Sequence, residues 1–438
     1  MISRRTLLGV AATTGVQAQR PKQPNLLFVV ADAWRGVALP SASDPNLRAP
    51  NLARLAREGA DCRRTYTSYP VCCPSRAAML TGKFPHAAGV TRNHALLPLA
   101  QPTMSAALKQ AGYRTGYIGK WHLDGEENPG FVPPQRRRGF DYWAAYNVQH
   151  QHFGSVYFRD TPVPIPAPGF EPDHLTDLAV DFLRQPSRQP FFLYLSIVAP
   201  HAPLTPPPRH ATYDPASLKL RNNVPKNAEP EARKSLAGYY GLCSAVDECV
   251  GRLLATLDDR RLVDDTIVVF TGDHGESLGS HGVDEIDLPH EEVSRIPFLM
   301  RYPRRIRAST TIDTPVSNVD FAPTLLALCG VSPPKGMQGE NLTGVLTQGR
   351  RPARVIYCEG GVYQPQPWRM AVRGNYKLVT DAALSPTQFY DLAADPYELD
   401  DRVAATSERR NRDRVAGAAT AMGSSHRLVS YLCSPHTK

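Results

Sequence analysis

The sequence contains no long apolar run. No stretch of 18 or more consecutive apolar residues occurs in its 438 residues, so nothing after the N-terminal segment is expected to span a membrane. Cysteine is also sparse, because eight residues in a chain of this length are far too few for a disulfide scaffold. There is neither an internal repeat nor a lysine- and arginine-rich run interleaved with aromatics, which excludes repeat architectures and argues against nucleic acid as a partner.

Positive charge is in excess. The formal net charge is +9, while 42% of the residues are hydrophobic, which is enough to bury a large core. Scattered surface arginines would explain this charge, and attraction to a polyanion is the sharper alternative. Since no nucleic-acid-binding pattern accompanies the charge, an anionic substrate fits better than DNA or RNA.

The first residues resemble an export signal of the twin-arginine type. Arg4 and Arg5 precede Leu7 and Leu8, and a mildly apolar stretch continues to Val16. Small residues then flank a cleavage point at residue 18. We therefore expect residues 1–18 to be a signal peptide and the mature protein to be exported, either periplasmic or secreted.

Apolar runs and amphipathic segments alternate along the chain. Nearly continuous apolar runs, typical of strands buried on both faces, occur at residues 24–32, 115–120, 191–198 and 266–270. Helical spacing is found at residues 50–59, 103–111, 175–183 and 236–257. This alternation predicts an α/β fold around a mixed, largely parallel sheet flanked by helices.

The pattern changes near residue 345. Short candidate strands at residues 354–357, 369–372 and 376–380 predict a small antiparallel sheet. We therefore expect a catalytic domain at residues 19–345 and a smaller C-terminal subdomain at residues 346–438.

Four short islands carry residues suited to catalysis. The first is Asp32, directly after its predicted strand. The others are Cys72-Cys73-Pro74-Ser75-Arg76 with Leu80-Thr81-Gly82, then Gly119-Lys120-Trp121-His122, then Thr271-Gly272-Asp273-His274-Gly275-Glu276. A weaker fifth piece is Pro200-His201-Ala202-Pro203. Active sites of open α/β sheets form beyond the carboxyl ends of the strands, where three of the four islands lie.

These islands resemble the sulfatase family in both their residues and their order. The pentapeptide at Cys72 with its Leu-Thr-Gly continuation is similar to the family signature, and family-like segments continue to Asp395-Pro396. The resemblance covers nearly the whole mature chain. It implies an alkaline-phosphatase-like fold and a sulfuric ester hydrolase that is arylsulfatase-like.

The resemblance also implies a mechanism. Cys72 would be oxidised to formylglycine by a maturation enzyme, and a hydroxyl of the hydrated aldehyde would attack the sulfur of a sulfated small molecule or glycan. Asp32, Cys72, Asp273 and His274 would hold a divalent metal, with Ca²⁺ the expected ion.

The remaining residues receive roles from the same resemblance. Arg76 and Lys120 would hold the nucleophile and the sulfate. His122 would assist proton removal, and His201 would help to protonate the leaving oxygen.

Two positions depart from the family pattern. Asp32 is followed by Ala33 where the family often has a second acid, so we expect weaker or altered metal binding. No lysine lies between Asp273 and Pro297, and Ile286 takes the place where the family usually has one. The leaving-group acid therefore stays open, with His201 the first candidate and His290 the second.

Two other functions remain open. A phosphonate monoester or phosphodiester hydrolase would use the same fold and nucleophile. A catalytically impaired protein that binds sulfated glycans would explain both departures.

Overall fold

The computed structural model describes residues 23–42, 44–405, 408–409 and 411–417. The expected signal peptide, residues 1–18, lies outside these ranges and stays a prediction. Within the described part of the chain, no helix combines the length and the apolar character that crossing a bilayer requires.

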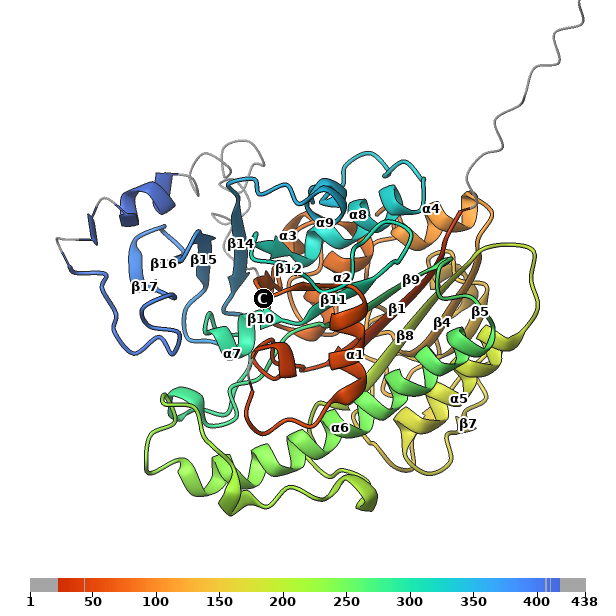
Figure 1. The fold of residues 1–438 in the computed structure, drawn as a ribbon, viewed down its shortest axis with the longest axis horizontal. Helices are drawn as coiled ribbons and strands as arrows, with labels where there is room; N and C mark the ends of the chain where they lie inside the picture. Colours follow the sequence, from red (N-terminus) through yellow and green to blue (C-terminus); the bar gives the residue numbers. More distant parts are fainter. Residues whose placement is uncertain (1–22, 43, 406–407, 410, 418–438) are drawn as a thin grey trace, which may run out of the picture.

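An eight-stranded mixed sheet forms the centre of the molecule (Figure 1). Five neighbouring strands are parallel, in the order β9-β1-β8-β4-β5. Beyond β9, β11 pairs antiparallel with both β9 and β2, and β12 pairs parallel with β2 at the edge. The strands are β1 (Asn25–Asp32), β2 (Ala60–Cys62), β4 (Arg114–Lys120), β5 (Tyr142–Tyr146), β8 (Phe191–Pro200), β9 (Thr266–Gly272), β11 (Phe298–Arg301) and β12 (Thr310–Ile312).

Helices cover both faces of this sheet and bury two separate hydrophobic cores. All eight residues of β1 are buried, because helices lie over both of its faces. The first core contains α1 (Pro50–Glu58), α5 (Glu171–Arg184) and α6 (Glu229–Asp259). The second contains α2 (Cys72–Thr81), α3 (Pro85–Ala88), α4 (Met104–Gln110), α8 (Phe321–Leu328) and α9 (Thr343–Gln348).

The C-terminal part forms its own four-stranded antiparallel sheet, drawn in blue in Figure 1. Its strands are β14 (Val355–Gly360), β15 (Trp368–Arg373), β16 (Tyr376–Asp381) and β17 (Pro386–Asp391). A buried cluster joins it to the main domain: Lys377 on β16 lies 2.7 Å from a carboxylate oxygen of Glu291 and 2.8 Å from one of Glu398. Glu291 opens the short helix α7 (Glu291–Ser294).

A three-stranded sheet lies between the two parts, in the order β10-β3-β13. Its strands are β10 (Arg295–Ile296), β3 (Thr65–Tyr66) and β13 (Val316–Ser317). Tyr66 packs into the core of the C-terminal sheet. A last pair, β6 (Val156–Tyr157) and β7 (Ile165–Pro166), is antiparallel.

The predicted α/β class and the small C-terminal antiparallel sheet are confirmed, while several element ends differ. The helix α6 begins at Glu229 rather than at residue 236, because its acidic first turn hides the apolar spacing. The helix α4 begins at Met104, since Thr103 is its N-cap and accepts a hydrogen bond from the Ala106 amide. The strand β17 was missed because its first three residues are not buried.

Candidate active site

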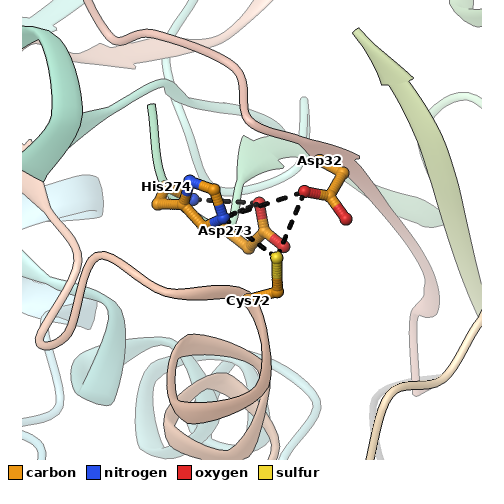
Figure 2. Close-up of side chains that lie close together, drawn as sticks. All are labelled: Asp32, Cys72, Asp273 and His274. Atoms are coloured by element: carbon orange, nitrogen blue, oxygen red, sulfur yellow. Dashed lines mark hydrogen bonds and ion pairs between the residues drawn. The ribbon is translucent and has the colours of Figure 1, made fainter. Parts of the chain in front are cut away.

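The candidate site lies where several parallel strands end. Asp32 is the last residue of β1, Lys120 is the last residue of β4, and Asp273 directly follows β9. The fourth element is α2, whose first residue is Cys72. Figure 2 shows the side chains of Asp32, Cys72, Asp273 and His274 pointing toward one another.

The Cys72 thiol is the centre of the group. Its Sγ lies 3.1 Å from His274 Nε2, 3.6 Å from Asp32 Oδ1 and 3.8 Å from Lys120 Nζ. Only 2% of the side-chain surface of Cys72 is exposed, and Asp32, Asp273 and His274 are fully buried. Three segments far apart in the sequence thus meet at one sulfur atom.

Two cations hold the carboxylates in place. Arg76 lies one helical turn after Cys72 on α2, and its Nη2 is 3.1 Å from Asp32 Oδ2 and 2.9 Å from Asp273 Oδ2. Lys120 Nζ donates to the same Asp32 oxygen over 2.5 Å. Arg76 Nη1 donates further to Ser196 Oγ and to the Lys120 carbonyl oxygen, which fixes the guanidinium.

The pKa values reflect this crowding of charge. Burial raises the pKa of Asp32, but Lys120 and Arg76 outweigh it and hold that pKa well below the ordinary value. Burial lowers the pKa of His274, but the negative charges of Cys72, Asp273 and Asp32 outweigh it and raise that pKa to about 10. The cluster therefore favours a positive charge at His274 Nε2, and a metal ion bound there would take the place of that proton.

This donor set fits a divalent cation. One ligand atom from each of Asp32, Cys72, Asp273 and His274 lies within 4.8 Å of all the others. A set of sulfur, nitrogen and two carboxylates suits Zn²⁺, whereas replacing the sulfur by oxygen gives the harder set that Ca²⁺ or Mg²⁺ prefers. The same four residues were predicted as metal ligands from the sequence, and a possible metal site at this position is what the structure shows.

The histidine His201 reaches the cluster through a neighbour that the sequence analysis did not assign. Its ring stacks on the ring of His150, with the centroids 4.1 Å apart. His150 Nε2 in turn lies 3.1 Å from Lys120 Nζ. Burial is the main cause that lowers the pKa of His150 to about 3, followed by the charge of Lys120, so its ring is neutral.

His122 lies beside the cluster in an environment that keeps it neutral. Burial, then the charges of Lys120 and Arg76, lower its pKa well below the ordinary value. Neither ring nitrogen has a hydrogen-bond partner within the described residues, and the His94 ring lies 5.0 Å from it between centroids. A neutral, unengaged imidazole can accept a proton.

The two departures have clear structural settings. Ala33 is fully buried, and its amide donates to Asp273 Oδ1 over 3.0 Å. Ile286 precedes Asp287, whose carboxylate accepts the amides of Gly361 and Tyr363 at 2.8 Å each.

His290, the second candidate for the leaving-group acid, lies elsewhere. Its ring stacks on the His281 ring with centroids 3.9 Å apart, beside Glu292 and Lys377. In the part of the chain that the structure describes, it contacts none of Asp32, Cys72, Asp273 and His274. His281, Glu292 and Glu398 also lie within 4.8 Å of one another, but Arg221 and Lys377 already neutralise the carboxylates of this second group.

Sequence reasoning missed Ser196 and Tyr363, whereas it expected the segment at residues 149–152 to shape the leaving-group pocket. His150 belongs to a polar segment with no strand or helix signal, and Ser196 lies inside a buried strand where a serine has no distinctive pattern. Tyr363 comes from the C-terminal subdomain, and after burial the charges of Cys72 and Asp287 help to raise its pKa. Of these residues, only His150 had a sequence feature that indicated a site, the pair of histidines at positions 150 and 152.

The fold and this cluster define an enzyme of the alkaline-phosphatase-like class. The profile of the family described as Sulfatase matches residues 24–331, and the profile described as N-sulphoglucosamine sulphohydrolase, C-terminal, matches residues 279–415. The chain is 35% identical to an ulvan-active sulfatase of Formosa agariphila over 396 residues, which are 87% of this chain and 77% of that protein.

Solved structures support the same family. A putative sulfatase from Bacteroides fragilis superposes with a TM-score of 0.87 at 27% identity, covering 94% of this chain and 98% of its own. A second structure, in complex with its substrate D-glucosamine-2-N,6-O-disulfate, superposes with a TM-score of 0.84 at 26% identity, covering 94% of this chain and 100% of its own. The chain belongs to the sulfatase family, and its activity is that of a sulfuric ester hydrolase.

Proposed function

We propose that this sulfatase removes sulfate from a sulfated glycan or a related small sulfate ester, with formylglycine made from Cys72 and one divalent cation, Ca²⁺. The observation that carries the proposal is the position of Cys72 Sγ, which lies within 4 Å of Asp32, Lys120 and His274 at once. A buried neutral thiol gains little from so many charged neighbours, whereas an oxygen nucleophile at the same place would be oriented by all of them.

Asp32, Asp273 and His274 would hold the cation together with an oxygen at position 72. Bound there, the cation would supply Lewis acidity and neutralise the negative oxygens of the sulfate. Formylglycine would supply a hydroxyl nucleophile as its hydrate, and a second hydroxyl whose deprotonation releases sulfate.

The chain's own side chains would do the rest. Arg76 and Lys120 would orient the nucleophile and bind the sulfate oxygens, since both are held rigidly against Asp32. Neutral His122 would take the proton from the hydrate. His201, stacked on His150, would give a proton to the departing oxygen.

Two of the similar proteins support a glycan substrate. One is named for activity on ulvan, and the other has a sulfated glucosamine bound as its substrate. The excess of positive charge in this chain agrees with such a substrate. A formylglycine-forming maturation enzyme would be a necessary partner, and residues 1–18 would export the folded protein.

The experiment that tests the nucleophile is peptide mass spectrometry of the tryptic peptide at residues 65–76. After co-expression with a maturation enzyme we expect the aldehyde in place of the thiol at Cys72, and Cys72→Ala should lose activity on an aryl sulfate by at least about 10³-fold. Parental activity in Cys72→Ala would sink the proposal. An unconverted, inactive protein would instead support the glycan-binding alternative.

Substrate class and export need separate measurements. Rates on an aryl sulfate, an aryl phosphonate and a diaryl phosphate should be highest for the sulfate. A reversed order would favour the phosphonate monoester or phosphodiester hydrolase. N-terminal sequencing of periplasmic protein should begin at Gln19, and an intact N-terminus in an active exported protein would contradict the signal peptide.

A further inference from the structure

A cavity of about 710 Å³ lies away from the Cys72 cluster, between the main domain and the C-terminal sheet. Its walls come from the segments around β12, from the end of α9, from the turn between β15 and β16, and from residues 411–415. Figure 1 shows β12 and α9 on the side of the main domain that faces the C-terminal sheet. Nothing in the proposed mechanism uses it.

The walls of this cavity are strongly basic. Seven arginines line it and Asp313 is the only carboxylate among the lining residues. Arg354 is neutralised, because its guanidinium lies 2.9 Å from Asp320 and 3.3 Å from Glu340. The other six form no ion pair with any described residue: Arg64, Arg307, Arg350, Arg351, Arg373 and Arg414.

Some of these unpaired guanidinium groups are nevertheless held in place. Arg64 donates to the Gly374 carbonyl oxygen and to Asn375 Oδ1, and Arg373 donates to the Arg414 carbonyl oxygen over 3.0 Å. Carbonyl oxygens fix the geometry of a guanidinium without cancelling its charge. Elsewhere on the surface, Arg54 and Arg209 each pair with two acids, whereas this cavity gathers six arginines without an ion pair to any described residue.

No acidic side chain outside the described residues can neutralise the cavity. Residues 1–22, 43, 406–407, 410 and 418–438 contain neither aspartate nor glutamate. Every Asp and Glu of the chain therefore lies in the described ranges, where none pairs with the six arginines. No carboxylate side chain of the protein therefore compensates these six charges within ion-pair distance.

We propose that this arginine cavity is a second anion-binding site that takes sulfate groups of a polymeric substrate, away from the ester being hydrolysed. A concave wall of one charge sign focuses the electrostatic potential and raises the local concentration of a polyanion. Guanidinium groups suit sulfate because their planar N–H pairs match two oxygens at once. The proposal rests on the proposed sulfated-glycan substrate.

The cavity lies within the reach of an oligosaccharide from the Cys72 cluster. Arg64 directly precedes β3 and Cys72 lies eight residues further on, so their Cα atoms are at most about 28 Å apart. Parallel to β3, β13 leads from the cavity residue Pro315 to Asn318, whose amide donates to Ser75 Oγ over 3.0 Å. An oligosaccharide of several sugars spans such a distance.

Nucleic acid is the competing polyanion, and the lining argues against it. Single-stranded nucleic acids bind where aromatic side chains stack on successive bases, and Tyr376 is the one aromatic residue that lines the cavity within the described chain. Duplex DNA could bind through its phosphates to positive charge alone, without aromatic side chains. It therefore enters the test as a probe.

The test is binding of dextran sulfate by full-length protein carrying Cys72→Ala, which prevents turnover. Arg350→Gln/Arg351→Gln should weaken binding about tenfold and reduce the salt dependence by about two ions, because each lost arginine releases one counterion fewer. Arg350→Glu/Arg351→Glu should weaken it further. All four substitutions are at exposed positions, and circular dichroism and thermal unfolding check that each variant folds.

A matched control removes the same charge elsewhere. Arg184 and Arg188 are also exposed, and Arg184 closes α5, far along the chain from every cavity segment. Arg184→Gln/Arg188→Gln should change the affinity by less than about twofold. Equal losses in both double variants, no loss in either, or tight duplex-DNA binding that falls in the same way would each overturn the proposal.

The outcome can be separated from the proposed function. Aryl sulfatase activity of the parent protein tests the reaction at Cys72, while the binding measurement uses a protein that cannot react. If the parent hydrolyses aryl sulfate and the cavity variants bind dextran sulfate as tightly as the control, only the second site fails. If aryl sulfatase activity is absent but the cavity variants lose binding, the second site stands without the proposed reaction.

Discussion

Two fully buried lysines of this protein sit in opposite surroundings. Lys120 pairs with one carboxylate, Asp32, and shares that oxygen with Arg76, which also pairs with Asp273. Lys377 pairs with two carboxylates, Glu291 and Glu398, and its third donor goes to the Pro289 carbonyl oxygen, while Arg295 lies 3.6 Å from the other oxygen of Glu291. Lys120 therefore pairs with a single carboxylate and still faces the Cys72 position, whereas all three donors of Lys377 are taken.

The difference shows how burial alone fails to identify a functional residue. For both lysines, burial lowers the pKa and neighbouring acids raise it again, so both pKa values end above the ordinary value. What separates them is the set of neighbours around the ammonium group. Lys120 Nζ lies 3.8 Å from Cys72 Sγ and 3.1 Å from neutral His150, neither of which is a carboxylate. A role in catalysis for Lys120 and a role in folding for Lys377 follow from that difference.

The largest expected effect is on catalysis at Lys120. Lys120→Met should lower kcat/KM on an aryl sulfate by about 10²- to 10³-fold, as expected for a donor aimed at developing negative charge. Removal of the lysine also relieves its repulsion with Arg76, so the thermal midpoint should change less than for Lys377. Steady-state kinetics at a temperature where the variant is folded checks this, and retained activity would remove Lys120 from the site.

At Lys377 we expect the effect on stability to exceed the effect on catalysis. Lys377→Met leaves Glu398 buried without its cation and Glu291 with Arg295 alone, and it should destabilise the protein by about 3–5 kcal/mol, with kcat/KM of the folded fraction close to the parent value. Thermal unfolding measures the loss. Adding Glu398→Gln should recover part of it, and Lys234→Met, at a lysine with 77% of its side chain exposed, should cost little.

A catalytic loss at Lys377 as large as that at Lys120, measured on folded protein, would contradict the distinction between the two clusters. So would a Lys377→Met variant as stable as the parent.

The cluster around Lys120 could be predicted from the sequence, whereas the cluster around Lys377 could not. Asp32, Lys120 and Asp273 lie at the ends of apolar runs, where α/β folds place their active sites, so local pattern and chemistry pointed to the same place. Lys377 lies within an alternating strand, where a lysine normally faces water, and only its tertiary partners Glu291 and Glu398 explain its burial.

Tertiary placement also explains the other omissions. His150 and Tyr363 come from loops whose course depends on tertiary packing, which no sequence periodicity indicates. The six unpaired arginines of the cavity are spread from Arg64 to Arg414, so no window of sequence shows them as a group.

A buried acid that forms no ion pair with any described residue sharpens the comparison further. Glu171 accepts a hydrogen bond from Tyr146, its second oxygen has no partner among the described residues, and burial raises its pKa from 4.5 to about 8. The folded state thus binds more protons than the unfolded state between these two values. Stability should therefore fall as the pH rises from 4.5 to 8, by roughly 1.4 kcal/mol per pH unit at most.

The substitution Glu171→Gln removes this titration. Thermal midpoints measured from pH 5 to 9 should decline less steeply with pH in the variant than in the parent, and the gap should widen up to about pH 8. Glu126→Gln, at an exposed position, serves as the control and should follow the parent curve. Parallel curves for parent and Glu171→Gln would show that Glu171 is already ionised in the folded protein.

The smallest expected effect concerns the metal site at Ala33. A φ of 60° places Ala33 in the left-handed region, which aspartate and asparagine tolerate better than most residues, and its amide already contacts Asp273. Ala33→Asp should bring a further carboxylate to the cluster and tighten Ca²⁺ binding about tenfold, because Ca²⁺ affinity rises with ligand charge. Ala33→Asn has nearly the same shape and backbone tolerance without the charge. Calorimetric Ca²⁺ titration of chelator-treated protein should rank aspartate above asparagine and the parent. If the two variants bind Ca²⁺ with the same affinity, the charge at position 33 does not reach the cation. The site is then complete with its four residues, Asp32, Cys72, Asp273 and His274.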